Sequence, residues 1–397
     1  MVTEARIREA HSRISGHVYR TPVIYSGSLS RLTGAQVYLK CENFQKTGSF
    51  KVRGAFNKLS GLRRGTKVIA ASMGNHAQGV AAAASALGMK ATIVMPEGAS
   101  PAKENAVRSY GAEVVLRGQT LSEAIDFARS RRGFTFIHPY DDEDIIAGQG
   151  TIGVELAEEM GEADHVVVPV GGGGLISGIA AYIKSVRPKA RVIGVQAGAA
   201  TSALDSFRKR RAVQRRPEPT LADGIAVGRV GRIALRHMLK YVDDVRAVTE
   251  SAIAQAVLLL MERRKLVVEG SGAVGLALLL EDAVRFRGKN VVLVISGGNI
   301  DFTLVDRIIE RGLVESGRTG TVEAVIEDVP GSLHSLTGIV ARERGNILTV
   351  AHDRLSKGLP IQKTSVRVTL EVKGRKHLGE IISAIRKEGI EVKEVPQ

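Results

Sequence analysis

The sequence predicts an α/β protein with parallel β-sheets, followed by a smaller domain with a different element order. Short β-branched runs alternate with alanine-rich helical segments over most of the chain, which is typical of a parallel sheet covered on both faces. Glycine-rich turns follow several of these runs, and the element order changes after a composition break at residues 310–320. The chain has 397 residues, enough for two or three domains.

Six apolar runs are expected to be strands, because each leads into a turn and then a helix-like stretch. They are KVIAA (67–71), ATIVM (91–95), AEVVL (112–116), HVVVPV (165–170), RVIGV (191–195) and NVVLVIS (290–296). Open parallel sheets bind ligands at the carboxyl ends of their strands. The glycine turns at these ends are therefore candidate binding loops.

The last 80 residues follow the order strand, helix, strand, strand, helix, strand, which predicts a ferredoxin-like domain over residues 318–397. The segments are TVEAVIE (321–327), SLHSLTGIVARERG (332–345), NILTVAHDRL (346–355), KTSVRVTLEV (363–372), HLGEIISAIRKEG (377–389) and IEVKEV (390–395). Residues 1–315 would then form the larger region.

Composition favours a soluble cytoplasmic protein. The only cysteine is Cys41, the first residues lack the apolar core of a signal peptide, and no stretch approaches the ~20 apolar residues of a membrane span. The net charge of +15 includes a basic cluster at residues 208–216, so we considered a nucleic-acid partner. Aromatic residues make up only 4 % of the chain, and Phe207 alone lies beside the cluster, so we expect no such partner.

Lys51 lies between two glycine turns in the stretch KTGSFKVRG (46–54). The like-charged neighbours Lys46 and Arg53 are expected to lower its pKa, which would suit a nucleophilic amine. From these nine residues alone, a solvated lysine at the start of a helix is the alternative.

Residues 166–183 read as a strand, four glycines (Gly171, Gly172, Gly173 and Gly174) and a helix. Such a loop leaves several N–H groups free to bind one anion at the helix start, although a tight turn is the alternative. The last glycine of the dinucleotide pattern is missing, and Gln196 ends the next strand where a ribose-binding acid is expected. A monophosphate therefore fits better than a dinucleotide.

Two further loops follow predicted strands, within residues 68–88 and 291–301. Their polar side chains include Ser72, Asn75, His76 and Ser296. The first group could hold a carboxylate or a ring hydroxyl, or could simply cap a helix, and the second alone is a glycine turn. Three strand-end loops together with Lys51 indicate pyridoxal 5'-phosphate held as a Schiff base.

Four stretches resemble, in order and spacing, the fold type II pyridoxal-phosphate enzymes, specifically the threonine ammonia-lyase (threonine dehydratase) and serine dehydratase family. They are ENFQKTGSFKVRGA (42–55), SMGNHAQG (72–79), GGGGL (171–175) and SGGN (296–299). The resemblance covers residues 1 to about 315 and implies two parallel-sheet α/β domains, with a small domain at about 48–150 inserted in the large one. It implies β-elimination of water from L-threonine, and from L-serine, to 2-oxobutanoate or pyruvate and ammonia, as in isoleucine biosynthesis and other amino-acid metabolism.

The resemblance also implies roles for single residues. Lys51 would form the Schiff base and then act as the base at Cα. Asn75 would bond the ring hydroxyl, Gly171 to Gly174 would bind the phosphate, and Ser296 would face the pyridine nitrogen. The substrate carboxylate pocket would be lined by Ser72, Asn75 and His76.

Two alternatives are a serine racemase or serine dehydratase of the same fold, and a catalytically idle amino-acid sensor. A racemase needs a second proton donor, and the position where related racemases have a serine is Met73, whose thioether has no proton to give. Gln196 and Ser202 stand where related racemases have acidic ligands, so we expect no tightly bound divalent metal.

The C-terminal region resembles an ACT regulatory domain, on the stretches EDVPGSL (327–333) and GNI (345–347). This implies a branched-chain amino-acid effector, isoleucine or valine, bound at Asp328 to Gly331 and near Asn346. A dimerisation module is the alternative. The resemblance further implies a homo-oligomer, a dimer or a tetramer.

Overall fold

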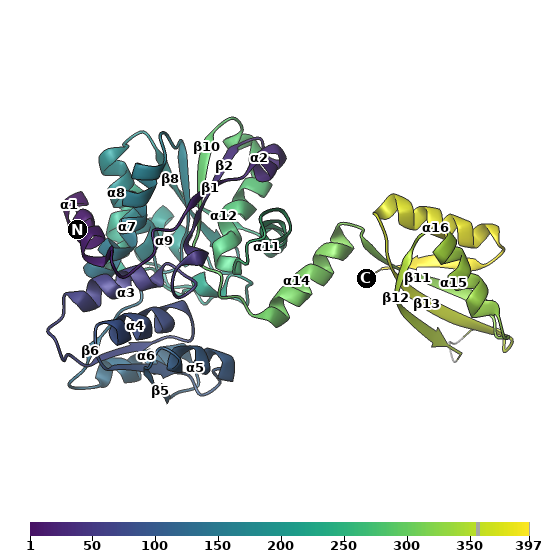
Figure 1. Ribbon diagram of the computed structural model, residues 1–397, viewed down its shortest axis with the longest axis horizontal. Coiled ribbons are helices and arrows are strands. Elements are labelled where there is room, and N and C mark those ends of the chain that lie inside the picture. The colour runs from purple at the N-terminus through teal and green to yellow at the C-terminus, as the bar shows by residue number, and fades with distance from the viewer. Residues whose placement is uncertain (355–357, 397) are drawn as a thin grey trace. The chain divides into compact units, whose positions relative to one another are not determined.

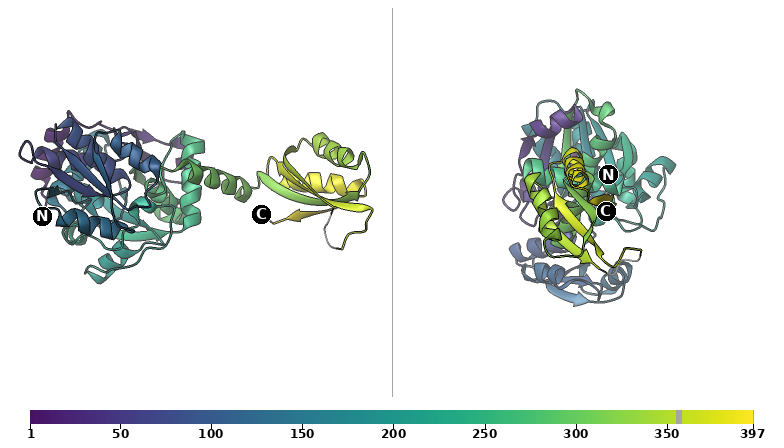
Figure 2. Two further views of the ribbon diagram at one scale, coloured as in Figure 1. Left: turned by 90° about the horizontal axis from the view of Figure 1, so that it is seen from below. Right: turned by 90° about the vertical axis from the view of Figure 1, so that its right-hand side faces the viewer.

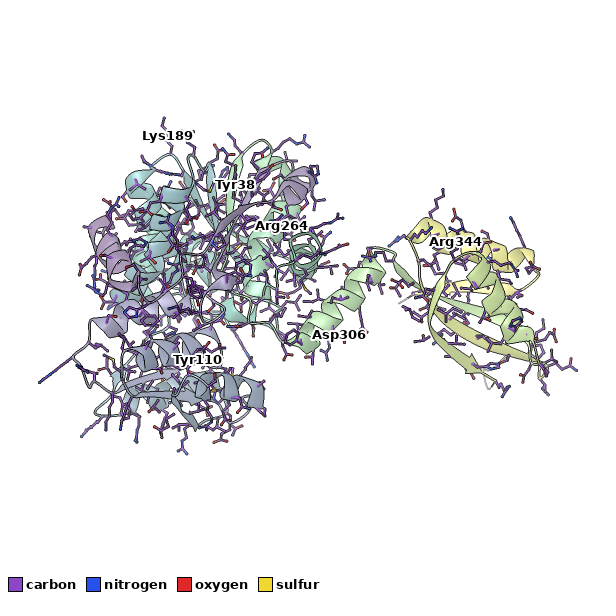
Figure 3. All side chains as sticks on the ribbon, in the orientation of Figure 1. Tyr38, Tyr110, Lys189, Arg264, Asp306 and Arg344 are labelled. Atoms are coloured by element: carbon purple, nitrogen blue, oxygen red, sulfur yellow. The ribbon has the colours of Figure 1, made fainter. Side chains whose placement is uncertain are left out.

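The computed structural model describes residues 1–354 and 358–396, and the chain divides into two units, Met1–Asp301 and Phe302–Gln397 (Figure 1). Side chains fill the space between the helices and sheets of each unit (Figure 3). Within the described residues, no helix is both long and apolar enough to cross a membrane.

The first unit contains a six-stranded sheet in the order β1-β2-β10-β7-β8-β9. Neighbouring strands are parallel except for the antiparallel edge pair β1–β2. The bounds are β1 (Val23–Tyr25), β2 (Gln36–Cys41), β7 (His165–Pro169), β8 (Arg191–Ala197), β9 (Asp244–Val248) and β10 (Asn290–Ile295). All five residues of β7 are buried, as expected of a strand covered on both faces.

Helices cover both faces of this sheet. Val166 and Val168 of β7 pack in one core cluster with Ile176 and Ile179 of α8 (Gly174–Val186). Val167, between them, faces α12 (Gly270–Glu281), where it lies beside Gly275. In Figure 1, α7 and α8 lie on one side of the strands and α11 and α12 on the other. The remaining helices of these layers are α1 (Glu4–Ile14), α2 (Gly27–Thr33), α7 (Glu143–Glu159), α9 (Ser202–Lys209), α10 (Arg232–Tyr241), α11 (Glu250–Arg264) and α13 (Ala283–Phe286).

A second, parallel sheet of four strands has the order β5-β4-β3-β6. Its strands are β3 (Val68–Ala71), β4 (Ala91–Met95), β5 (Glu113–Leu116) and β6 (Thr135–Phe136), and its helices are α4 (Asn75–Ala86), α5 (Pro101–Arg108) and α6 (Leu121–Ser130). All six predicted strands of the first unit are confirmed, and with them the α/β class. The sequence missed β1, β2, β6 and β9, which lack a continuous apolar run flanked by turn signals.

The second unit begins with helix α14 (Phe302–Glu315) and continues with an antiparallel sheet in the order β12-β13-β11-β14. Helices α15 and α16 cover one face of this sheet (Figure 2). The bounds are β11 (Thr319–Glu327), α15 (Ser332–Arg342), β12 (Asn346–Asp353), β13 (Lys363–Glu371), α16 (Arg375–Lys387) and β14 (Glu391–Val395). The predicted βαββαβ order is confirmed. The expected end of its second strand, Leu355, lies outside the described residues.

The break predicted at residues 310–320 is partly helical. Helix α14 runs through its first half, and the structure groups this helix with the C-terminal unit. We expected residues 302–315 to belong to the larger region. The structure differs because the composition of the chain does not reveal which neighbouring unit a helix contacts.

Candidate active site

Lys51 is the first residue of helix α3 (Lys51–Ser60), and the end of β10 holds the residues just before it. Ser49 forms a β-bridge with Gly297, and the Phe50 N–H donates to the Ser296 carbonyl at 3.1 Å. β10 lies in the middle of the main sheet, so Lys51 starts its helix at the carboxyl edge of that sheet. This is the edge at which open α/β sheets bind ligands.

The Lys51 amine has an environment suited to the neutral form. Its Nζ donates to the Pro139 carbonyl at 3.1 Å. Burial lowers the pKa of Lys51 to about 8, and the charge of Glu269 acts in the opposite direction. We expected like-charged neighbours to lower this pKa, and that explanation is wrong. Arg53 is paired with Glu42 and Glu155, and desolvation of the amine is the cause.

Glu269 is a site residue that the sequence did not reveal. Its buried carboxylate accepts hydrogen bonds from Asn75 Nδ2 at 2.9 and 3.0 Å and from Ser271 Oγ at 2.8 Å. Burial raises the pKa of Glu269 to about 7, although the bonds from Asn75 and Ser271 act in the opposite direction. The available signal was a carboxylate directly before the GSG (270–272) that opens an apolar helix.

Asn75, the first residue of α4, joins two of the predicted loops. Besides the bonds to Glu269, its Oδ1 accepts from Asn299 Nδ2 at 2.6 Å, and Asn299 Nδ2 also donates to the Thr47 carbonyl at 2.9 Å. Gly48 allows this approach: its φ is +70°, and a Cβ there would lie 2.4 Å from Asn299 Oδ1. The structure thus brings together the loops that carry Lys51, Asn75 and Ser296.

Ser72 and His76 belong to the same stretch as Asn75 and differ in whether their side chains are free to bind a ligand. Ser72 is half-buried, and its Oγ accepts from the Gly74 N–H at 3.2 Å. His76 is buried, and its Nε2 bonds the Ile137 carbonyl at 3.0 Å, so Nε2 carries the proton. Burial, with the charge of Lys51, lowers the pKa of His76 to about 3. His76 is therefore neutral near pH 7, and its Nε2–H is committed to the backbone.

The four-glycine loop connects the end of β7 to the start of α8. Within the described residues, no acceptor receives a hydrogen bond from the N–H groups of residues 171–175. Tyr140 covers the loop closely, since a Cβ on Gly172 would lie 2.3 Å from the Tyr140 ring and one on Gly174 would lie 2.9 Å from the Tyr140 carbonyl. Gly173 has a φ of +92°. The loop offers free donors at a helix N-terminus, which suits an anion.

The loop also lies close to Lys51. β7 and β10 are parallel neighbours, so Gly171 and Ser296 follow strands that end at the same edge of the sheet. Pro139, whose carbonyl accepts from Lys51, precedes the Tyr140 that covers the glycines. Lys51, the glycine loop and the end of β10 therefore form one site.

Comparison with known proteins agrees with this geometry. Residues 14–297 match the family described as "Pyridoxal-phosphate dependent enzyme". The chain belongs to this family. An L-threonine ammonia-lyase of Thermotoga maritima is 47 % identical over 99 % of both chains. A solved threonine deaminase, from the organism abbreviated T.th., is 41 % identical, with a TM-score of 0.73 over 76 % of this chain and 99 % of that one. Maize serine racemase is 33 % identical, with a TM-score of 0.74 over 79 % of this chain and 98 % of that one.

The family's cofactor is pyridoxal phosphate, and the residues of this site fit it. The free N–H groups of residues 171–175 suit the phosphate, and the amine of Lys51, with its lowered pKa, suits the aldehyde carbon. The hydroxyl of Ser49, next to Phe50, is buried without a hydrogen-bond partner among the described residues. This hydroxyl is therefore available to a group that binds at the site.

The side chains of Gln196 and Ser202, which stand where related racemases have acidic metal ligands, both form hydrogen bonds with backbone groups. Gln196 Oε1 accepts from the N–H groups of Ala203 and Leu204 at 3.0 and 2.9 Å, at the start of α9. Ser202 Oγ donates to the Val227 carbonyl at 2.5 Å.

The three predicted effector residues are not brought together within one chain. Asp328 follows β11 at the Lys363 end of β13, where it pairs with Arg354, and Gly331 caps α15 nearby. Asn346 opens β12 opposite Glu371, at the other end of β13. β13 has nine residues, so its two ends lie roughly 27 Å apart. The reason is that α15 crosses the whole sheet between β11 and β12.

Proposed function

We propose that the chain deaminates L-threonine, and L-serine as a second substrate, by β-elimination of water. The substrate loses its Cα proton and its β-hydroxyl as water, and hydrolysis of the product gives 2-oxobutanoate or pyruvate and ammonia. The observation that carries the proposal is the amine of Lys51, whose pKa is lowered to about 8 beside a loop of free N–H groups. The names of the relatives support the same substrate.

When bound, the cofactor withdraws electrons from Cα and so makes the Cα proton removable. Lys51 would hold the cofactor through its amine, and the neutral amine would take the Cα proton of the substrate. The N–H groups of residues 171–175 would bind the phosphate. The side-chain amide of Asn75, which bonds Glu269, would bond the ring hydroxyl, and the hydroxyl of Ser296 would face the ring nitrogen. A neutral serine there would leave that nitrogen without a proton, which would favour elimination over transamination.

The substrate carboxylate binds at the start of α4, where Ser72 and Asn75 supply a hydroxyl and an amide and the helix supplies free N–H groups. His76 takes part through its backbone N–H, since its Nε2–H bonds Ile137.

Substitution of Lys51 tests this proposal. Lys51→Ala should abolish keto-acid release from both amino acids, while Lys46→Ala, an exposed lysine five residues earlier, should leave it unchanged. Purified wild-type protein should be yellow and lose its visible absorbance on borohydride treatment. A colourless wild-type protein that releases no keto acid would favour a sensor without catalysis. Lys51→Ala activity within about tenfold of wild type would overturn the role of Lys51.

For residues 318–397, the part of the C-terminal unit after α14, we propose an ACT domain that binds isoleucine or valine. Helix α15 starts at Gly331 without a side-chain cap, so its first N–H groups are free for a carboxylate. Since Asn346 lies at the opposite end of the sheet, a site with all three residues takes Asp328 and Gly331 from one copy and Asn346 from a second. Deletion of residues 318–397 should remove the response to these amino acids and leave elimination. No calorimetric binding to full-length protein would make the unit a dimerisation module.

A further inference from the structure

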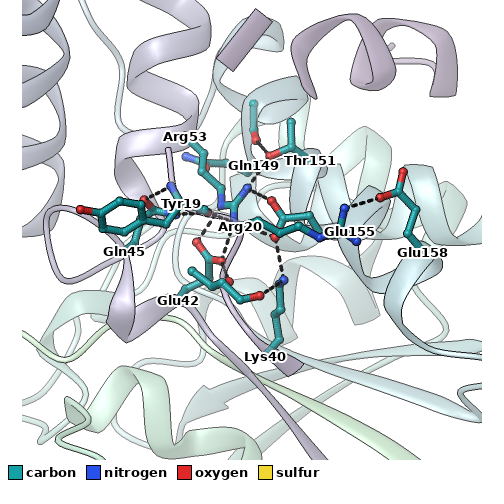
Figure 4. Close-up of polar contacts among 12 residues, drawn as sticks. Tyr19, Arg20, Lys40, Glu42, Gln45, Arg53, Gln149, Thr151, Glu155 and Glu158 are labelled. Carbon is teal, nitrogen blue, oxygen red and sulfur yellow. Dashed lines mark hydrogen bonds and ion pairs between the residues drawn. The ribbon is translucent and has the colours of Figure 1, made fainter. Parts of the chain in front are cut away.

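Four charged side chains are buried in one cluster that includes Arg53, two residues after Lys51. Figure 4 shows the guanidinium of Arg53 between Glu42 and Glu155, with Lys40 bonded to Glu155. Arg53 Nε lies 2.7 Å from Glu42 Oε2, Arg53 Nη1 lies 2.6 Å from Glu155 Oε1, and Lys40 Nζ lies 2.6 Å from Glu155 Oε2. All four side chains are at most 2 % exposed.

The guanidinium of Arg53 is fully bonded. Besides the two ion pairs, its Nη2 donates to Glu42 Oε1 at 2.8 Å, Glu155 Oε2 at 3.0 Å and the Tyr19 carbonyl at 3.2 Å. Its Nη1 also donates to Thr151 Oγ1 at 3.2 Å. Burial by itself lowers the pKa of Arg53, but the charges and hydrogen bonds of Glu42 and Glu155 outweigh it and raise the pKa. The fork therefore stays charged and in one orientation.

Stability alone does not account for such a cluster. Removing four charges from water carries a large desolvation cost, and well-packed apolar residues in place of a buried ion pair are often as stable or more stable. Apolar contacts, however, do not define the orientation of the side chains that make them. A bidentate guanidinium–carboxylate contact defines distance and angle at both ends.

The ion pairs of this cluster connect other elements of the first unit to the first turn of α3. Glu42 directly follows β2, whose partner β10 ends directly before Ser296, and Glu155 lies on α7. The first turn has no side-chain cap, because Phe50 occupies the cap position. α7 also approaches closely, since a Cβ on Gly148 would lie 2.7 Å from the Arg53 carbonyl. The fork of Arg53 thus joins the turn that carries Lys51 both to the main sheet and to α7.

We propose that Arg53 is a positioning residue for Lys51, holding the start of α3 so that the amine stays in register with Ser296 and the glycine loop. This inference rests on the proposed role of Lys51. The proposal predicts a specific signature: loss of the fork shifts the amine without removing any group that touches substrate or cofactor. A small displacement of a reacting group costs as much as about 100-fold in rate.

The test compares Arg53→Lys and Glu42→Gln with the control Arg20→Met. Arg53→Lys keeps the charge and loses the fork, and Glu42→Gln keeps the shape and loses one charge. Arg20 forms a surface pair with Glu158 and Glu159 and is half exposed, so its removal breaks ion pairs in the same region without touching α3.

Three experiments are done on each holoenzyme: steady-state kinetics giving kcat and KM for threonine, a pH titration of the visible absorbance, and thermal unfolding. For both cluster variants we expect kcat to fall at least about tenfold, with KM within about threefold of wild type. We also expect the absorbance midpoint to move by at least about half a pH unit, because the environment of the amine changes. Arg20→Met should match wild type in all three.

The outcomes separate this inference from the proposed function. Wild-type protein without a borohydride-sensitive visible band would overturn the role of Lys51 itself. If that band is present and the cluster variants lose unfolding temperature but keep the wild-type kcat and midpoint at temperatures where they are folded, Arg53 is only structural. Should Arg53→Lys fail to fold, Glu42→Gln decides. Failure of both to fold would make the cluster a stability element and also overturn the proposal.

Discussion

A methyl group added to the glycine loop should weaken cofactor binding in a calculable way. In Gly172→Ala the new Cβ would lie 2.3 to 2.4 Å from three ring atoms of Tyr140, whereas carbon atoms normally approach to about 3.5 Å. The ring or the loop must therefore move by more than about 1 Å. Where the loop moves by this amount, at least one of the proposed N–H bonds to the phosphate should break, and a hydrogen bond to a charged group contributes about 1.5 to 3 kcal/mol. The expected loss of affinity is roughly 10- to 100-fold.

The assay is a titration of apoenzyme with pyridoxal phosphate, followed by visible absorbance, and repeated with pyridoxal, which lacks the phosphate. Gly172→Ala should lose affinity for the phosphorylated form and keep its affinity for pyridoxal, because only the phosphate meets the loop. Gly161→Ala is the control, since its Cβ would meet no atom within 4 Å. Equal affinity of Gly172→Ala and wild type for pyridoxal phosphate, to within about twofold, would show that residues 171–175 do not bind the phosphate.

Three further predictions follow from other residues. The pKa of Glu269 is raised to about 7, and its ionised carboxylate accepts the bonds that orient Asn75, so wild-type kcat/KM should rise as the pH rises through about 7, and this limb should be missing in Glu269→Gln. An unchanged profile in Glu269→Gln would show that ionisation of Glu269 does not control activity. The folded-state pKa of His76 is lowered to about 3, so the unfolded chain binds more protons than the folded chain between that value and 6.5, and the free energy of unfolding should fall as the pH falls below 6.5, by at most about 1.4 kcal/mol per pH unit. The unfolding temperature of His76→Gln should depend less on pH than that of wild type, and an equal pH dependence would contradict the burial of His76. The thioether of Met73 has no proton to donate, so chiral chromatography of a partly consumed L-serine reaction should show negligible D-serine in wild type and more D-serine in Met73→Ser. If wild type formed D-serine at a rate comparable to pyruvate, a group other than residue 73 would be donating the proton.

Much of the site was predictable because its parts are local. Lys51, Asn75, Gly171 to Gly174 and Ser296 each stand in a short motif. Asn75, Gly171 to Gly174 and Ser296 lie at the ends of predicted strands, whose carboxyl ends a parallel sheet brings to one edge, whereas Lys51 was recognised from its glycine-flanked stretch alone. Glu269 stands in no such motif. Its role depends on contact with Asn75, 194 residues away in the chain, and no local pattern indicates that contact.

One explanation failed, and one expected group of residues is not brought together within a single chain, for a related reason. The neighbours of Lys51 in sequence suggested charge repulsion, but Arg53 is turned toward Glu42 and Glu155, and desolvation lowers the amine's pKa. The motifs of Asp328 and Asn346 suggested one effector site, but α15 carries the chain across the sheet between them. Nearness in the sequence does not show where a side chain points or which end of a sheet a residue reaches.

The sequence by itself determined the α/β class, the βαββαβ order of the C-terminal unit and the loops that carry the chemistry, because hydrophobic periodicity and glycine turns act over a few residues. Only the tertiary structure decided the lowered pKa of Lys51, the environment of Glu269 and the buried pairing of Arg53. These depend on which side chains exclude water from one another, and that follows from packing between elements that lie far apart in the chain.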